Sequence, residues 1–128
     1  MTKDDLTNMV ELHRKIRKME DDIEVLYTKA TKVNCPLTDI KVQSSNLNLS
    51  AMYLDEASDL THDVAKVKDE LNNLICELSK CFERFNNDEK LVAMYRYISG
   101  DSWDSVAEDM HYSIRQVFKL NGKIISKL

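Results

Sequence analysis

Residues 102–120 read SWDSVAEDMHYSIRQVFKL, and the order of their small, turn-forming and apolar residues predicts two short helices joined by a tight turn. Ala107 is the small residue that a helix-turn-helix needs where its two helices cross, His111 falls in the turn, and Val117 is the apolar anchor of the second helix. His is enriched among the non-glycine residues found at positive φ, so it can occupy the position that glycine often takes. The stretch therefore predicts a helix-turn-helix.

The residues around this turn have the caps and apolar positions that such a motif requires. Asp101 or Ser102 begins the first helix, and Ser113 caps the second by accepting from backbone N–H groups of its first turn. We expect Trp103 to pack against Tyr95 or Tyr97. The remaining apolar sites belong to Val106, Met110, Tyr112 and Leu120, with Ile124 and Leu128 also inside.

Charge is distributed unevenly along the chain, whose net charge is −4. Residues 1–85 hold 12 basic and 16 acidic residues, whereas residues 86–128 hold six of each. Within residues 110–128, Arg115, Lys119, Lys123 and Lys127 occur with no acidic residue, so we expect all four to face no acid. A purely basic helix in an acidic chain indicates a surface that contacts phosphates. The alternative is a solvated helix face on which the charges are segregated by chance.

The helix predicted at residues 113–127 is therefore a candidate for reading the major groove of double-stranded DNA. Arginine suits guanine and glutamine suits adenine, while isoleucine or phenylalanine can touch a thymine methyl group. Asn121 and Lys123 are better placed for contacts to the DNA backbone. The candidate DNA-binding residues are Ser113, Ile114, Arg115, Gln116, Phe118, Lys119, Asn121 and Lys123.

Two heptad patterns precede this region, each with apolar residues spaced alternately by three and four. The first is Met9, Leu12, Ile16, Met19, Ile23, Leu26, Ala30 and Val33, and the second is Ala57, Leu60, Val64, Val67, Leu71, Leu74, Leu78, Cys81 and Phe85. They predict two long helices that form a coiled-coil arm, closed either within one chain or between two chains. Met52, Leu54, Ile75 and Phe82 widen the second apolar face and leave room for a homodimer contact.

A connecting loop is predicted at about residues 34–50, where Pro36 ends the first helix and Asn48 or Ser50 can cap the second. Asn87 or Asp88 can cap a third helix, which closes at Gly100, a position suited to a left-handed C-terminal cap. The expected fold is all-α: a long helical coiled-coil hairpin at residues 1–85, followed by a helix-turn-helix domain at residues 86–128.

Other classes of protein are disfavoured by the sequence. It has no uninterrupted apolar stretch of signal-peptide or membrane-spanning type, so we expect a cytoplasmic protein without a membrane partner. Cys35, Cys76 and Cys81 lack metal-ligand spacing and are expected to be ordinary reduced thiols. With no glycine-rich phosphate loop and no nucleophile beside a base, neither an enzyme nor a cofactor or metal site is expected.

The C-terminal forty or so residues carry a family resemblance. The run RYISG at residues 96–100, Trp103, and YSIRQV at residues 112–117 resemble the C-terminal helix-turn-helix of sigma-70-type factors, which reads the −35 promoter element. They are more similar to small phage and prophage proteins of Gram-positive bacteria like the ArpU and RinA late-gene regulators. Val106, Asn121 and Ile124-Ile125 depart from that pattern but keep apolar character or small polar size.

This resemblance implies a transcriptional regulator of phage or prophage origin that binds DNA through its C-terminal helix and can touch RNA polymerase through its arm. A small-terminase-like DNA-packaging protein is an alternative, because such proteins also join a DNA-binding helical module to an oligomerising arm. A coiled-coil module that binds host polymerase or a regulator is a third possibility, and the long amphipathic helices motivate it.

Overall fold

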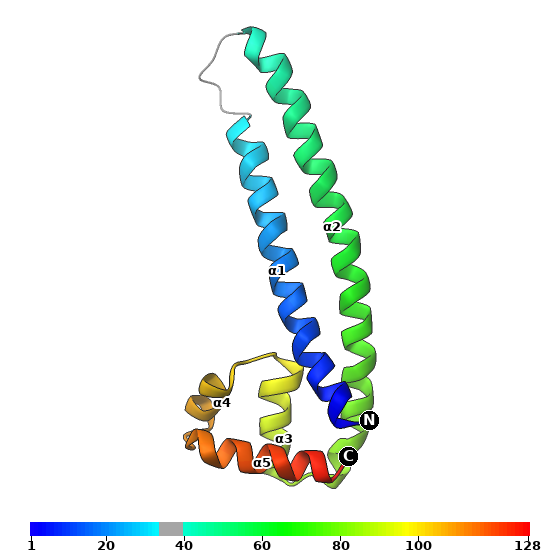
Figure 1. Cartoon of the computed structure of the whole chain (residues 1–128), viewed down its shortest axis with the longest axis vertical. Helices are drawn as coiled ribbons and strands as arrows, with labels where there is room; N and C mark the ends of the chain where they lie inside the picture. The colour runs from blue at the N-terminus through cyan, green and yellow to red at the C-terminus, as the bar shows by residue number, and fades with distance from the viewer. Residues whose placement is uncertain (34–39) are drawn as a thin grey trace. The chain divides into compact units, whose positions relative to one another are not determined.

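Every regular element among the described residues is a helix. The computed structural model describes the backbone of residues 1–33 and 40–128 and the side chains of residues 1–31 and 49–128. The elements are α1 (Lys3–Val33), α2 (Ile40–Cys81), the 3-10 turn η1 (Phe82–Arg84), α3 (Asn87–Ala93), the π-helix η2 (Met94–Ile98), α4 (Trp103–Met110) and α5 (Ile114–Ser126) (Figure 1). No strand occurs among the described residues, and the protein is all-α.

The two long helices bury many of the predicted heptad positions within one chain, while the side chain of Val33 lies outside the described residues. From α1, these include Met9, Leu12, Ile16 and Ala30, and from α2 Ala57, Val64, Val67, Leu71 and Leu78, all buried. Leu6, which the predicted pattern omits, is also buried and continues the same stripe toward the N-terminus. Both stripes therefore have buried positions within the single chain.

The chain divides into two compact units, and the division differs from the predicted boundary at residue 85. The terminal unit comprises Met1–Arg14 and Asp69–Leu128, and the hairpin unit comprises Lys15–Lys68. The first turns of α1 belong with the C-terminal helices because they pack and bond there. His13 Nε2, for example, donates to the Tyr97 carbonyl oxygen at 2.8 Å.

In the hairpin unit, α1 and α2 are joined by polar as well as apolar contacts. The Ser50 hydroxyl is buried and donates to the Ala30 carbonyl oxygen at 3.5 Å. Since α2 already begins at Ile40, the predicted loop at residues 34–50 is wrong over its second part, and neither Asn48 nor Ser50 caps a helix. The helix continues because residues 40–50 contain no Gly or Pro to interrupt it. Cys35 and Pro36 lie outside the described residues.

A capping box at the start of α3 places a buried acid in the terminal unit. The Asn86 side chain accepts from the Glu89 N–H at 2.9 Å, and the Glu89 carboxylate accepts from the Asn86 N–H at 3.1 Å. The predicted caps, Asn87 and Asp88, are therefore wrong by one or two positions. Asparagine and aspartate are both good N-cap residues, so residue type alone did not distinguish Asn86 from Asn87 or Asp88 as the cap.

The predicted third helix is interrupted before it ends. The α-helix stops at Ala93, and Met94–Ile98 form a π-helix, with the Ser99 N–H donating to the Met94 carbonyl oxygen at 2.9 Å. Gly100 closes the segment at a φ of 76°, as predicted. A Cβ at this position would lie 2.7 Å from His13 Cγ, so glycine is required by close approach as well as by its backbone conformation.

Among the described residues, no helix combines the length and the apolar character that crossing a membrane requires. This agrees with the charged residues spaced along both long helices.

Candidate nucleic-acid interface

The turn between α4 and α5 has the predicted left-handed residue. His111 adopts φ 57° and ψ 33°, the only non-glycine residue of the described chain at positive φ. Its N–H donates to the Glu108 carbonyl oxygen at 3.2 Å, and the Tyr112 N–H donates to the Ala107 carbonyl oxygen at 3.0 Å. These bonds end α4 and reverse the chain, so His111 serves as the turn residue.

Each helix of the pair begins at a serine that accepts a backbone hydrogen bond. Ser102 accepts from the Ser105 N–H at 3.2 Å, and Ser113 accepts from the Gln116 N–H at 3.3 Å. The Gln116 side chain completes a capping box, because its Oε1 accepts from the Ser113 N–H at 3.2 Å. Bidentate pairing of Gln116 with adenine would require this bond to open, which weakens its predicted role in base reading.

The inner face of α5 carries the expected anchors. Val117 and Ile124 are fully buried, and Val106 and Ala107 of α4 are buried against this helix. Leu120 and Leu128 are half-buried on the same side. The packing predicted for the helix-turn-helix is therefore confirmed.

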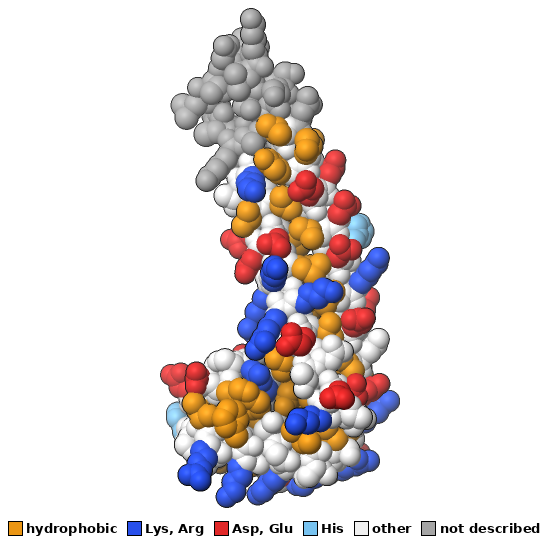
Figure 2. Space-filling model, viewed as in Figure 1, with side chains coloured by type: hydrophobic (Ala, Val, Ile, Leu, Met, Phe, Trp, Pro, Cys, Tyr) orange, Lys and Arg blue, Asp and Glu red, His pale blue; other side chains and the backbone are white. Residues whose placement is uncertain are grey.

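The outer face of α5 leaves four of the predicted contact residues exposed next to one another. Arg115 and Lys119 are exposed, and Ile114 and Phe118 keep 41% and 50% of their surface accessible. Figure 2 shows Lys and Arg side chains projecting along the segment that Figure 1 labels α5. Gly122 lies on the same face, and a Cβ built there meets nothing within 4 Å. This face therefore combines positive charge with apolar surface.

Phe118 is held in place by an aromatic cluster. Its ring meets that of Trp103 edge-on at a centroid distance of 5.2 Å, and Trp103 meets Tyr97 at 6.5 Å. Of the two partners expected for Trp103, Tyr97 makes the ring contact. One side of Phe118 packs on Trp103, and half of the residue's surface remains available to a ligand.

Asn121 and Lys123 lie in different surroundings. Lys123 is exposed, as expected for a contact to a DNA backbone, whereas Asn121 is half-buried and its Oδ1 accepts from the Tyr97 hydroxyl. This bond attaches α5 to η2. Asn121 is therefore engaged inside the terminal unit, and the predicted backbone contact would have to come from its remaining amide N–H groups.

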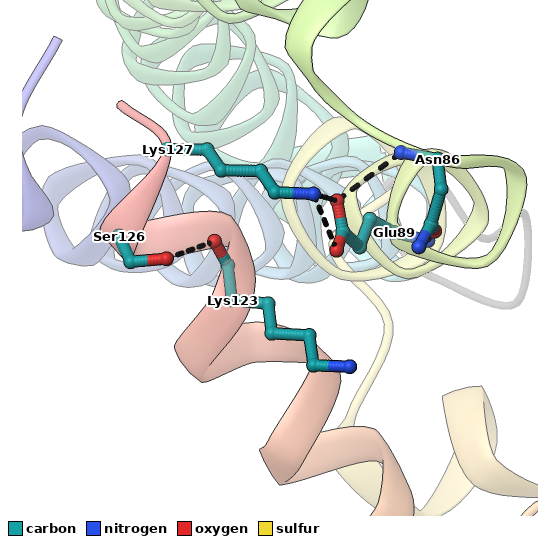
Figure 3. A network of polar contacts seen from close by, with 5 residues as sticks. All are labelled: Asn86, Glu89, Lys123, Ser126 and Lys127. Atoms are coloured by element: carbon teal, nitrogen blue, oxygen red, sulfur yellow. Dashed lines mark hydrogen bonds and ion pairs between the residues drawn. The ribbon is translucent and has the colours of Figure 1, made fainter.

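Lys127 does not belong to the free basic face. Its ammonium donates to both carboxylate oxygens of Glu89, at 2.7 and 2.9 Å, and Glu89 has no exposed surface (Figure 3). Burial raises the pKa of the Glu89 carboxyl, but the bonds from Lys127 and Asn86 and the charges of Lys127 and Lys123 outweigh it, so this pKa lies below its ordinary value. The expectation that all four basic residues face no acid is wrong for Lys127, because the partner comes from α3.

Sequence reasoning also missed Asp88, which lies beside the basic face. A cleft of about 240 Å³ is lined by Asp88, Tyr112, Lys119 and Lys123, among others. The negative charge of Asp88, followed by burial and a hydrogen bond from the Tyr112 hydroxyl, raises the pKa of Tyr112. Asp88 is 24 residues before Tyr112 in the sequence, so only the folded chain shows that it lines a cleft together with residues of α5.

Comparisons of the chain with models of protein families, with curated proteins and with solved structures return no match.

Proposed function

We propose that this protein is a sequence-specific DNA-binding regulator of transcription that reads the major groove with α5. The observation that carries the proposal is the turn at His111 between two serine-capped helices, with α5 anchored by Val117 on one side and exposing Arg115 and Lys119 on the other. This is the arrangement by which a helix-turn-helix presents its second helix to DNA.

Each exposed residue has a separate part in the proposed complex. Arg115 pairs with guanine or a phosphate, and Ile114 and the exposed part of Phe118 meet thymine methyl groups. Lys119 and Lys123 contact phosphates and release counterions, so affinity should fall steeply with salt. Ser113 holds the N-terminus of α5, whose free N–H groups and partial positive charge favour a phosphate.

The role in transcription, and a phage or prophage origin, rest on the resemblance to sigma-70-type and ArpU- or RinA-like proteins. That resemblance is supported by the observed geometry at residues that carry it: Gly100 has a positive φ, and Trp103 packs on Tyr97. RNA polymerase is proposed as a protein partner on the same basis.

A protein-interaction role for the hairpin unit is the second candidate, and exposed apolar side chains favour it. Val25, Tyr27, Leu49, Met52 and Leu54 each keep between 38% and 55% of their surface accessible. Since α1 and α2 already close their heptad positions within one chain, these side chains are left for a partner. A second copy in a homodimer, or polymerase, would cover them.

A gel-shift series on genomic fragments tests DNA binding. Arg115→Ala and Lys119→Ala should each weaken binding about tenfold, the loss of one good base or phosphate contact. Lys66→Ala removes an exposed lysine from α2 and is the matched control, which should bind like the unmodified protein. Equal binding by all three variants, with affinity insensitive to salt, would contradict the proposal and favour the protein-interaction role.

A further inference from the structure

A cavity of about 290 Å³ in the terminal unit lies apart from the outer face of α5. Its walls come from the first turns of α1, from η2, from Trp103 of α4, and from Asn121 and Ile125 of α5. Three cationic residues line it, Lys3, Arg14 and Arg96, against one acid, Glu11. The cavity is therefore positively charged and partly apolar.

Arg96 has no carboxylate to neutralise it among the described residues. Its guanidinium stacks on the Trp103 ring at 4.4 Å, and Nη1 donates to the Asp101 carbonyl oxygen at 2.9 Å. Its Nε is buried, with no hydrogen-bond partner in the described part of the chain. Burial lowers the pKa of Arg96 and the charge of Arg14 lowers it further, because the two guanidinium groups repel each other.

The backbone that presents Arg96 is itself unusual. Arg96 and Tyr97 belong to the π-helix Met94–Ile98, a conformation that is rare and occurs frequently at functional sites. The Tyr97 hydroxyl donates to Oδ1 of Asn121, so the amide N–H groups of Asn121 remain as donors. The polar groups lining the cavity are therefore mostly hydrogen-bond donors, the composition that complements an anion.

We infer that this cavity binds a small anion bearing a phosphate group, held between the guanidinium groups of Arg14 and Arg96. Guanidinium groups form paired, charge-assisted hydrogen bonds with phosphate oxygens. A bound phosphate would also relieve the repulsion between the two arginines. The inference is independent of DNA binding, since neither residue lies on α5.

Trp103 provides the measurement because it is the only tryptophan of the chain and its ring forms part of the cavity wall. The full chain is titrated with inorganic pyrophosphate at constant ionic strength, and tryptophan fluorescence is recorded. We expect a saturable change in emission. Arg14→Gln should weaken binding about tenfold, the loss of one charge-assisted contact. Glu11→Gln, which removes the one acid of the cavity, should tighten binding about threefold.

Two features make the result decisive. The Arg14 side chain is 69% exposed, so its substitution should leave the fold intact, whereas Arg96 also holds Trp103 and Asp101 and a variant there can unfold the unit. Lys66→Gln changes an exposed cationic residue of α2 outside the cavity and away from α5, and is the matched control. No saturable change, unaltered binding by Arg14→Gln, or an equal loss in Lys66→Gln would each overturn the inference.

Discussion

Lys127, near the C-terminal end of the chain, pairs with Glu89 in the first turn of α3, where the carboxylate is inaccessible to solvent. Arg84 Nη1 reinforces this corner by donating to the Lys127 carbonyl oxygen at 3.3 Å. The end of α5 is thereby attached to the segment that joins α2 to α3. The orientation of the candidate reading helix depends on both of its ends, with the His111 turn at one and this ion pair at the other.

Lys127→Met should destabilise the protein, because it leaves the Glu89 carboxylate buried without its cation. We expect a loss on the order of 2 kcal/mol, less than for a fully buried pair, because 37% of the Lys127 side chain is accessible. Urea denaturation measures it. The double variant Glu89→Leu, Lys127→Met should recover much of the lost free energy of unfolding. If the losses of the two single variants simply add in the double variant, the pairing is contradicted.

The same pair makes stability depend on pH. Since the folded-state pKa of Glu89 lies below its ordinary value, its contribution is present above the unfolded-state pKa, about 4.3, and is lost as the pH falls through the lower folded-state value. Melting temperature recorded between about pH 6 and pH 3 should therefore fall less steeply for Glu89→Gln than for the unmodified protein. Parallel curves would show that other carboxylates account for the acid sensitivity.

His111→Gly should stabilise the turn or leave it neutral, since glycine adopts a φ of 57° without the strain that a side chain introduces. The gain is at most about 1 kcal/mol, because glycine also increases the freedom of the unfolded chain. His111→Val should instead lower stability, since a β-branched residue is poorly tolerated at positive φ. Thermal denaturation distinguishes the two, and stabilisation by valine would contradict the assigned conformation.

Gln116→Glu separates the structural role of this side chain from its proposed role toward DNA. Glutamate keeps the capping box with Ser113 and places a negative charge where the helix N-terminus favours it, so melting temperature should hold or rise. Affinity for DNA should nevertheless fall, because the new charge repels phosphates. Unchanged affinity would mean that the start of α5 lies away from the duplex.

Gly122→Ala tests whether something approaches the outer face of α5 closely. Alanine should raise the stability of the protein by about 0.8 kcal/mol, the difference in helix propensity, since its Cβ meets no atom within 4 Å. If DNA lies against this face, affinity should fall while stability rises. If Gly122→Ala stabilises the protein and its affinity for DNA is unchanged, Gly122 lies outside the surface that contacts DNA.

The sequence predicted best those features that depend on neighbouring residues. The two heptad stripes, the caps at Ser102 and Ser113 and the left-handed His111 all follow from spacing and side-chain type, and the structure confirms them. Gly100 was likewise predictable from its position after the helix. Local chemistry determines these positions, so they can be read along the chain.

Features that depend on tertiary contacts were not predictable in the same way. The partner of Lys127 is 38 residues away along the chain, and that of Asn121 is 24 residues away. From the sequence, both side chains are expected to face solvent, because their own helix has no acidic residue that could pair with them. The spacing of apolar residues does not reveal the π-helix at Met94–Ile98. The sequence therefore did not predict that Arg96, which belongs to this π-helix, lines a cavity without a neutralising carboxylate among the described residues.

In vitro selection of bound duplexes from a random pool tests whether α5 reads double-stranded DNA. We expect enrichment of one defined sequence whose binding weakens with salt, and loss of that enrichment in Arg115→Ala but not in Lys66→Ala. A pool that stays random after selection, or one that Arg115→Ala enriches equally well, would contradict it.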